Sequence, residues 1–580
     1  MSKPERSNTT LLIAASFTAG MALFAIFYGP FILIPGNFGI VDHDFFLAWQ
    51  LAVNDALRHG ELLHWFHHMC GGVPGLANPQ SGALAPLNVL GLIMGPVAQF
   101  KIELVIHGAL GLIGFLYFCH LKKIPAYYAL FGFMIWTGNG LVATRVLHGQ
   151  TTYYPLLVLP LFVSLLFATN KARALLIGAL LFVFVLYEDG FHVFIYNYPL
   201  LGILALGMAY QRRDAAPVIA LTLWAIIGII LALPRLLPTI ELLQHFPRLV
   251  PNKEFIGVTD LLSVLVNENL FEIYAATSEG QQDVHWVGYI AYVGFIPVIL
   301  TAGFFLLARD EDWIAWLVAM LMSFALALGH LSDWAPWSIL HQLPFAEQVR
   351  APFKFVSFLL LSLAFLSILG AHGISQLLHK RFAGTGKSAW LAPATVTLPL
   401  IVLTVDLNLA HQPLFIQAFN QYQKSYQSID RSNPFDAHDF NDHVMFSAVA
   451  NNLGVINCYD PIKPRNEATP DTPLAQVTVG SGQADASISP NKIHVNTTIE
   501  SDTGARILIN QNDHSNWIVT QGEGVLIRNP EIGLLMLQVP RGATETQLRY
   551  QPEIFHASLW LTIVLAVLLS GFAFWLSRKD

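Results

Sequence analysis

The chain has 580 residues, of which 54% are hydrophobic and only 12% are charged, and its mean hydropathy is +0.52. Soluble domains carry about a quarter charged residues, so this composition excludes an ordinary soluble protein. The net charge is −7, and Lys and Arg fall in short, separated clusters, which excludes a nucleic-acid-binding surface. The composition therefore predicts a polytopic α-helical membrane protein.

Membrane-spanning helices are predicted wherever about 17 to 25 consecutive residues are predominantly apolar. Lys and Arg recur at every second connection, and the positive-inside rule places such connections in the cytoplasm. Both termini are therefore predicted to be cytoplasmic, and the first apolar stretch is interpreted as a retained span. The long connections 36–101, 235–285, 331–352 and 409–556 then face outward. The twelve predicted spans are residues 11–35, 102–120, 124–146, 153–169, 173–188, 191–210, 215–234, 286–308, 313–330, 353–373, 389–408 and 557–577.

The composition divides the chain into three regions. Residues 1–408 form the predicted multi-span membrane domain, whose first outer connection is residues 36–101. Residues 409–556 are polar, with alternating segments between turn residues, and they predict a β-rich extracytoplasmic domain. Residues 557–580 are the predicted final transmembrane helix and a cytoplasmic tail. The clearest predicted strands are Lys492–Ile499, Arg506–Asn510 and Leu534–Val539.

Several common chemistries lack their motifs in this sequence. There is no P-loop and no Rossmann glycine fingerprint, so direct use of ATP or of a nucleotide sugar has no visible site. A substrate delivered through the lipid bilayer is the natural alternative. The three cysteines, Cys70, Cys119 and Cys458, form no CxxC pair and are interpreted as free thiols, a bridge between Cys70 and Cys458 being the alternative.

Two acids one residue apart, Asp42 and Asp44, follow the first predicted span at the membrane–water boundary. A carboxylate in a partly buried site can act as a general base toward an acceptor hydroxyl, or can hold a divalent cation that neutralises a leaving phosphate. The alternative is a pair of solvated acids, with Asp44 capping the helix that follows. His64, His67 and His68 come next on a predicted amphipathic segment, and they are interpreted as interfacial, with no metal assigned.

Ionisable residues recur at the outward ends of the predicted spans. Glu188, Asp189 and His192 interrupt two apolar stretches, and such groups at membrane depth are usually functional, the alternative being a hairpin that emerges into water. Cationic side chains at outward helix ends can bind a lipid phosphate, because they pair with phosphate oxygens. Snorkelling of single side chains to the interface is the alternative. The candidates of this kind are Arg145, His148, Arg235, Arg350 and Lys354.

Several stretches together resemble the YfhO-like membrane proteins of bacteria. They are VDHDFF, GELLHWFHHMCGGVPGLANPQSGALAPLN, LPRLLPTIEL, VRAPFKFVSF, NNLGVINCYDP and the closing VPRGATETQLRYQPEIFHASLWLT. The resemblance covers nearly the whole chain, and the YfhO-like proteins are similar to the GT-C superfamily of glycosyltransferases. The outer domain departs from the family's Tyr-Pro-Gly-Trp turn, since it has Asp513-His514-Ser515-Asn516-Trp517 instead.

The resemblance implies a GT-C-like enzyme of the bacterial cytoplasmic (inner) membrane with its active site outside the cytoplasm. Such an enzyme transfers a sugar from a polyprenyl-phosphate-linked donor to an envelope glycan, lipid or protein acceptor. The resemblance places the catalytic acid at Asp44 or Asp42, and Asp44 is favoured because aromatic residues follow it. It also assigns Asn78 and Gln80 to the substrate pocket.

Two other functions are compatible with the sequence. A transporter or flippase for lipid-linked sugars would also have many spans, although transporters commonly show paired halves with interrupted helices. A non-catalytic assembly factor for envelope polymers would use the β-rich domain for binding. Neutral replacement of Asp42 and Asp44 distinguishes these functions, because only the enzyme requires the acids.

Overall fold

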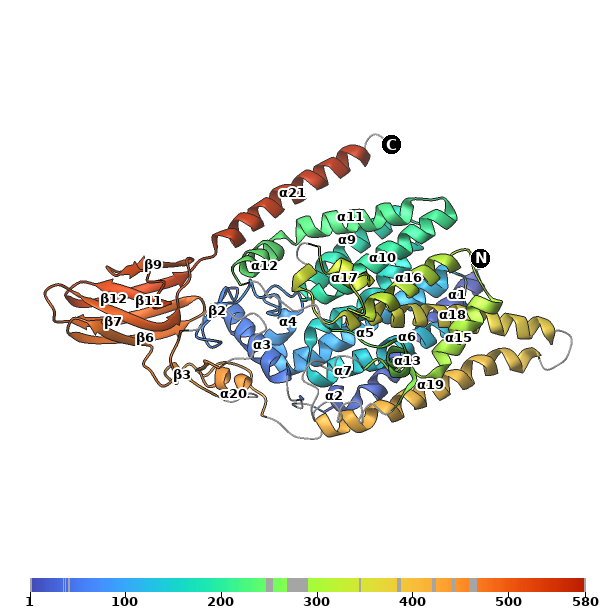
Figure 1. Ribbon diagram of the computed structural model, residues 1–580, viewed down its shortest axis with the longest axis horizontal. Helices are drawn as coiled ribbons and strands as arrows, with labels where there is room; N and C mark the ends of the chain where they lie inside the picture. The colour runs from blue at the N-terminus through green and yellow to red at the C-terminus, as the bar shows by residue number, and fades with distance from the viewer. Residues whose placement is uncertain are drawn as a thin grey trace.

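The computed structural model has a helical part and a β-rich part at opposite ends of the molecule (Figure 1). Both chain termini lie on the side away from the β-strands, and their cytoplasmic location stays a prediction. The described residues are 3–34, 36, 38–39, 42–246, 254–268, 290–343, 346–382, 388–419, 424–440, 444–457 and 467–577.

Apolar helices make up the helical part, because a helix satisfies its own backbone hydrogen bonds where no water is available. Two pairs are bent, by 49° between α6 and α7 and by 78° between α11 and α12. The helices are α1 Lys3–Phe27, α2 Gly29–Ile32, α3 Asp42–Arg58, α4 Asn88–Met94, α5 Pro96–Leu121, α6 Ala129–Gly138, α7 Gly140–His148, α8 Leu159–Leu166, α9 Lys171–Tyr187, α10 Phe191–Arg212, α11 Ala216–Leu231, α12 Leu233–His245, α13 Val258–Val266, α15 Phe295–Leu307, α16 Trp313–Ala327, α17 Pro336–Leu340, α18 Val356–Arg381, α19 Ser388–Phe419, α20 Met445–Ala450 and α21 Glu553–Ser577.

Each of the twelve predicted spans falls on one of these helices or on a bent pair. Within the described residues, however, five helices are long and apolar enough to cross a membrane, or up to seven if each bent pair counts as one span. Further apolar helices have only 10–17 residues, whereas a hydrocarbon core about 30 Å thick requires about 20. The predicted count of twelve spans is therefore not confirmed.

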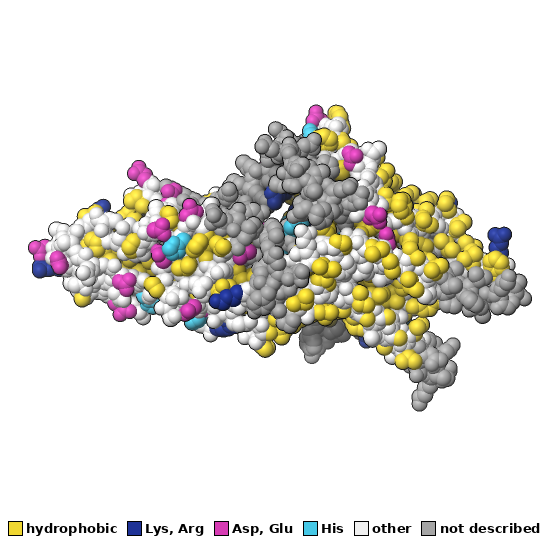
Figure 2. All heavy atoms as spheres, turned by 90° about the horizontal axis from the view of Figure 1, so that it is seen from below, with side chains coloured by type: hydrophobic (Ala, Val, Ile, Leu, Met, Phe, Trp, Pro, Cys, Tyr) yellow, Lys and Arg dark blue, Asp and Glu magenta, His cyan; other side chains and the backbone are white. Residues whose placement is uncertain are grey.

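The surface of the helical part is apolar. Figure 2 shows hydrophobic side chains over much of it, whereas acidic, basic and histidine side chains gather over the β-rich part. Large apolar side chains stand exposed on single helices, for example Leu206 of α10 at 59% and Leu306 of α15 at 74%. Lipid tails solvate such a surface and water does not. The helical part is therefore a multi-pass membrane domain.

Three of the basic connections meet at one end of the helices. Lys122 donates to Asp310 at 2.8 Å and to Asp312 at 3.1 Å, and Arg212 donates to the two carboxylate oxygens of Asp312 at 2.6 Å and 2.5 Å. Asp312 is fully buried, and a buried carboxylate requires paired cations. The connections that follow α5, α10 and α15 therefore lie side by side, as the predicted alternation of connections requires.

The outer domain is a sandwich of two antiparallel four-stranded sheets, in the orders β10-β11-β8-β5 and β6-β7-β12-β9. Alternate side chains of both sheets form one apolar core. The three predicted strands are confirmed as β7, part of β8 and β11. The strands are β5 Ala475–Val479, β6 Gly482–Ser489, β7 Lys492–Ile499, β8 Ala505–Asn512, β9 Trp517–Gln521, β10 Val525–Ile527, β11 Leu534–Val539 and β12 Gly542–Tyr550.

The start of the polar region, residues 411–475, is rich in Asn, Asp and Gln and is predicted to be less regular than the strands that follow. Helix α19 continues to Phe419, past the predicted boundary at residue 408. Before the sandwich, the described chain forms α20 and two short parallel strands, β3 (Asp436–His438) and β4 (Leu453–Val455). This segment packs α20 against α3, and it therefore joins the membrane domain to the sandwich.

The first outer connection folds as α3, a short hairpin and α4. Strand β1 (Trp65–Phe66) pairs with β2 (Val73–Pro74). The prediction of an amphipathic segment carrying the three histidines is wrong, because His67 and His68 lie between these strands. The glycines at 71 and 72 adopt positive φ values of 72° and 99°, which close the hairpin at no steric cost.

The hairpin is inserted against the sandwich through buried amide side chains. Oδ1 of Asn491 accepts from the backbone N–H groups of His64 and Trp65 at 2.8 Å and 3.0 Å, and its Nδ2 donates to Glu61 and to the Leu62 carbonyl. Asn512 donates to two further carbonyl groups of the hairpin turn at 2.7 Å and 2.8 Å. The irregular backbone of the connection is thereby satisfied without water, as a buried loop requires.

The cysteines differ in part from expectation. Cys70 is disulfide-bonded, so its interpretation as a free thiol is wrong. Cys119 is a buried free cysteine, as predicted, and Cys458 lies outside the described residues. The backbone N–H of Cys70 donates to the carbonyl of Val455 at 2.8 Å. Strand β4 therefore lies beside the hairpin, although the two are far apart in the sequence.

Substitution of Asn491 should release the hairpin from the sandwich. Asn491 has a φ of 60°, so Asn491→Gly keeps the backbone conformation and removes only the side chain. The loss of its four hydrogen bonds should cost roughly 2–4 kcal/mol and lower the midpoint of thermal unfolding in detergent. The exposed Thr498→Ala on β7 is the matched control. An unchanged midpoint in Asn491→Gly would contradict this account of docking.

Candidate functional site

Asp42 lies at the start of α3, where the helix N-terminus favours a negative charge. Its carboxylate is buried and accepts a hydrogen bond from Nε2 of Gln150 at 2.6 Å. The oxygen of the same amide accepts from Arg145 at 2.7 Å. One glutamine side chain therefore connects a carboxylate on α3 to a guanidinium on α7.

Arg145 belongs to a cationic and aromatic cluster around Tyr153. The guanidinium carbon of Arg145 lies 4.8 Å from the Tyr153 ring centroid, and Nζ of Lys354 lies 5.4 Å from it. His192 stacks on the same ring, with centroids 4.5 Å apart and planes at 14°. Lys354 also lies 5.5 Å from the ring of Tyr196. Cations over ring faces are held by the ring quadrupole, which fixes the position of both positive charges beside the ring.

Two more predicted phosphate ligands lie close to this cluster. The carbonyl of Arg350 accepts a hydrogen bond from the Tyr196 hydroxyl at 2.5 Å. His148 ends α7 one turn after Arg145, and its Nδ1 donates to the carbonyl of Thr144 at 2.7 Å. The structure thus places the charges of Arg145 and Lys354 beside one ring pair, to which Arg350 is joined through its backbone.

Asp44, which the sequence favoured as the catalytic acid, makes different contacts from Asp42. Its Oδ2 accepts from the backbone N–H of Met445 at 2.6 Å, and its Oδ1 accepts from that of Phe446 at 3.1 Å. These N–H groups belong to the first turn of α20, which has no intrahelical partner for them. The carboxylate of Asp44 therefore ties α3 to the segment that precedes the sandwich.

A divalent cation shared by Asp42 and Asp44 does not fit this arrangement, because both oxygens of Asp44 face backbone N–H donors. In the described part of the chain, no group of three or more His, Cys, Asp or Glu is placed to hold a metal ion. The chemistry proposed for Asp42 therefore includes no metal step.

The hairpin histidines serve the contact with the sandwich. The ring nitrogens of His67 lie 3.1 Å from Oε1 of Gln511 and 3.1 Å from the carbonyl of Ser489. Nε2 of His68 donates to Oδ1 of Asn452 at 2.9 Å. Burial lowers the pKa of His68 to about 3, so this histidine is neutral at physiological pH.

Arg235 on α12 already has partners for its guanidinium. It is fully buried, and it donates to the carbonyls of Leu76 and Asn78 and to the Asp189 carboxylate. Asp189 sits in the tight turn between α9 and α10 with a φ of 58°. The arrangement braces the end of the first outer connection against that turn, and it favours a structural role over phosphate binding.

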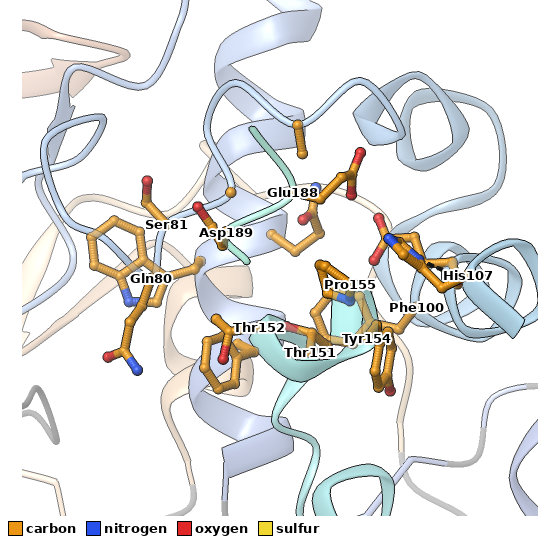
Figure 3. A pocket seen from close by; sticks show the side chains of 16 residues that line it. Gln80, Ser81, Phe100, His107, Thr151, Thr152, Tyr154, Pro155, Glu188 and Asp189 are labelled. Atoms are coloured by element: carbon orange, nitrogen blue, oxygen red, sulfur yellow. Dashed lines mark hydrogen bonds between the residues drawn. The ribbon is translucent and has the colours of Figure 1, made fainter. Parts of the chain in front are cut away.

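A pocket of about 420 Å³ of atom-free space, part of it open to solvent, lies between α3, α5, the 3-10 helix η2 (Thr151–Val158) and the turn at 188–189 (Figure 3). Three buried carboxyl groups line it, those of Glu103, Glu188 and Asp189. Gln80 also lines it, whereas Asn78 shapes the loop by accepting the Gln80 N–H at 2.9 Å.

Burial raises the pKa of both turn carboxyl groups in this pocket. Burial raises the pKa of Asp189 to about 6, although Arg235 opposes this rise. Burial and the nearby charge of Glu103 raise the pKa of Glu188 well above its usual range. The pocket therefore favours ligands that donate hydrogen bonds or carry positive charge.

The predicted site residues form two groups and not one. His192 and Lys354 join Arg145 in the cationic cluster, whereas Glu188 and Asp189 line the acidic pocket. Glu103 and His107 were not among the candidates, although both line the pocket. They lie four residues apart inside an apolar span. Ionisable residues inside a membrane span are usually functional, and this rule could have identified both residues from the sequence.

Comparisons with known proteins give structural likeness only. No protein-family model and no curated protein matches the chain, so the resemblance to YfhO-like proteins is not confirmed. The solved structures with a similar backbone include GT-C glycosyltransferases. They are ArnT from Cupriavidus metallidurans bound to undecaprenyl phosphate (TM-score 0.49, 10% identity, 77% of this chain and 86% of that one), arabinofuranosyltransferase AftD from Mycobacteria (0.44, 12%, 76% and 31%) and the Archaeoglobus fulgidus oligosaccharyltransferase (0.38, 10%, 77% and 64%).

Removal of the Arg235 charge should destabilise the protein. Arg235→Met leaves the Asp189 carboxyl and two carbonyls without their donor and should cost roughly 3–5 kcal/mol. Asp189→Asn tolerates the positive φ, so the double variant should recover part of this loss. Thermal unfolding in detergent measures both. If the changes in thermal midpoint caused by the two substitutions simply added in the double variant, a direct interaction between Arg235 and Asp189 would be contradicted.

Acidification should weaken the docked hairpin through His68. Its pKa of about 3 in the folded protein lies below the unfolded value of about 6.5, so the unfolded state binds the extra proton. The contribution is complete above about pH 6.5 and falls by about 2 kcal/mol by about pH 5. His68→Gln keeps an N–H donor without this titration. Its thermal midpoint should fall less with pH, and parallel slopes would contradict the assignment.

Proposed function

We propose that this protein is a membrane glycosyltransferase that moves a sugar from a polyprenyl-phosphate-linked donor to an envelope glycan, lipid or protein acceptor outside the cytoplasm. The observation that carries the proposal is the hydrogen-bonded series Asp42–Gln150–Arg145. It places a buried carboxylate beside a cationic cluster, as a base and a phosphate site must be placed for transfer from a lipid phosphate. The sequence resemblance to YfhO-like proteins implies the same reaction class.

The proposed reaction is a displacement at the anomeric carbon of the donor sugar. The acceptor hydroxyl attacks this carbon, and its proton passes to the Asp42 carboxylate. The bond from the carbon to the phosphate oxygen breaks, and the lipid phosphate leaves with the electron pair. Arg145 and Lys354 neutralise the charge that develops on the phosphate. Gln150 keeps the base and the cation at a constant separation.

Asp42 takes the role of the base in this proposal, although the sequence favoured Asp44. Both oxygens of Asp44 accept backbone hydrogen bonds from α20, so a substrate proton would have to compete with two donors for this carboxylate. Asp44 is assigned a positioning role, because it links the start of α3, where Asp42 lies, to the segment below the sandwich.

The two acids should respond differently to neutral substitution. Asp42→Asn should lower the transfer of labelled sugar by about 10²–10⁴-fold with an unchanged thermal midpoint. Asp44→Asn should lower transfer and midpoint together, because Asn keeps only one acceptor oxygen and turns its NH₂ group toward the second backbone donor of α20. Transfer is measured in membranes with equal amounts of each variant and a panel of polyprenyl-phosphate donors, with the exposed Asp485→Asn on β6 as control.

Three results would contradict the proposal. Full activity of Asp42→Asn would remove Asp42 from the mechanism. Loss of transfer after chelation would bring a divalent cation into it. Absence of donor turnover across the panel, while labelled lipid still crosses the bilayer, would assign the protein to transport.

A further inference from the structure

The acidic pocket between α3, α5 and the turn at 188–189 has more hydrogen-bond acceptors than its own residues have donors to pair with them. Among the described residues, Arg235 is the one cation paired with its carboxyl groups, and its partner is Asp189. Glu188 accepts from a backbone N–H at 3.0 Å, and Glu103 accepts from the neutral amide of Gln99 at 2.6 Å. Two buried carboxyl groups therefore line the pocket with neutral partners.

Four further polar atoms of the pocket lining are buried without a partner in the described structure, and one of them is the amide oxygen of Gln80. His107 is 1% exposed, and its Nδ1 donates to the Glu103 carbonyl at 2.7 Å, which leaves Nε2 as an acceptor. The indole N–H of Trp49 and the hydroxyl of Tyr154 are donors that are also unpaired. Since buried polar groups are nearly always paired, these atoms indicate a ligand with both donors and acceptors.

The geometry points to this pocket as a recognition site for a primary ammonium group carried by the substrate. The ammonium N–H groups would donate to Glu103, Glu188 and His107, and its charge would compensate the carboxylates. Oxygen atoms next to the amine would accept from Trp49 and Tyr154. An amino sugar has this combination, and so does an ethanolamine headgroup.

The pocket lies next to the proposed reacting groups. Thr151 and Thr152 line it and follow Gln150, which holds Asp42. The ammonium site therefore adds a substrate class to the proposed function. It rests on that function only in taking the reaction to be sugar transfer. Ammonium binding itself is measurable without transfer.

Binding of an amine should depend on pH. The raised pKa of Glu188 means that an incoming ammonium must displace a carboxyl proton. The other ionisable groups that face the pocket or its carboxyl groups are Glu103 and His107 of α5, Asp189 of the turn, and Arg235 of α12. Affinity should therefore rise with pH as the carboxyl groups ionise, as long as the amine stays protonated.

The experiment is isothermal titration of the purified full chain in detergent with glucosamine, N-acetylglucosamine, glucose and ethanolamine. Glucosamine should bind about tenfold or more tightly than N-acetylglucosamine, which lacks the charge, and Glu188→Gln should remove this preference. Glu103→Gln provides a second variant if Glu188→Gln does not fold. Asp485→Asn on the sandwich is the control for unchanged binding. Ethanolamine separates an amino sugar from a headgroup amine as the source of the ammonium.

Equal affinity for glucosamine and N-acetylglucosamine would overturn the inference. So would an unchanged preference in a Glu188→Gln or Glu103→Gln variant that keeps the wild-type thermal midpoint, or displacement of glucosamine by equimolar Mn²⁺. Preference for glucosamine that persists in Asp42→Asn would support the site independently of transfer, whereas loss of transfer alone would concern only the proposed function.

Discussion

The insertion of the first outer connection against the β-sandwich is the constraint on which the rest of the structure depends. That connection has little regular structure, and its buried backbone must find partners outside itself. Asn491 supplies them from the turn between β6 and β7, and Gln511 and Asn512 supply them from β8. Trp65 adds its indole ring to the sandwich core. The position of α3, and with it Asp42, is therefore set jointly by the membrane domain and by residues more than four hundred positions later.

Two groups of charged residues lie beside the 3-10 helix η2, and they differ in sign. The cationic cluster is built on Tyr153 and Tyr196, whereas the acidic pocket is built on Glu103 and the turn at 188–189. Their separation keeps Arg145 from being neutralised by the buried carboxylates. Gln150 is uncharged and connects the cation to Asp42 alone. This division is what a displacement reaction requires, because the leaving phosphate and the incoming acceptor demand opposite electrostatic environments.

Buried ion pairs hold both ends of the helical part. Arg235 and Asp189 brace the end that carries the first long connection, and Lys122 and Arg212 surround Asp312 at the end where the basic connections meet. Desolvation makes such pairs a poor source of net stability, but removal of one partner is costly. The pairs therefore specify which connections lie together, and so the relative placement of the helices that carry the site.

The sequence by itself determined the elements that arise from local pattern. Apolar stretches became helices, alternating segments such as Lys492–Ile499 became strands, and the first outer connection was recognised by acids and turn residues in a polar segment. Only the tertiary structure decided what the polar side chains do. Asp44 caps α20, Arg235 pairs with Asp189, and Cys70 is disulfide-bonded. Local hydropathy was also insufficient to determine the number of spans. The physical reason is that periodicity acts over a few residues, whereas a buried charge or amide is defined by partners that the chain brings back from far along its length.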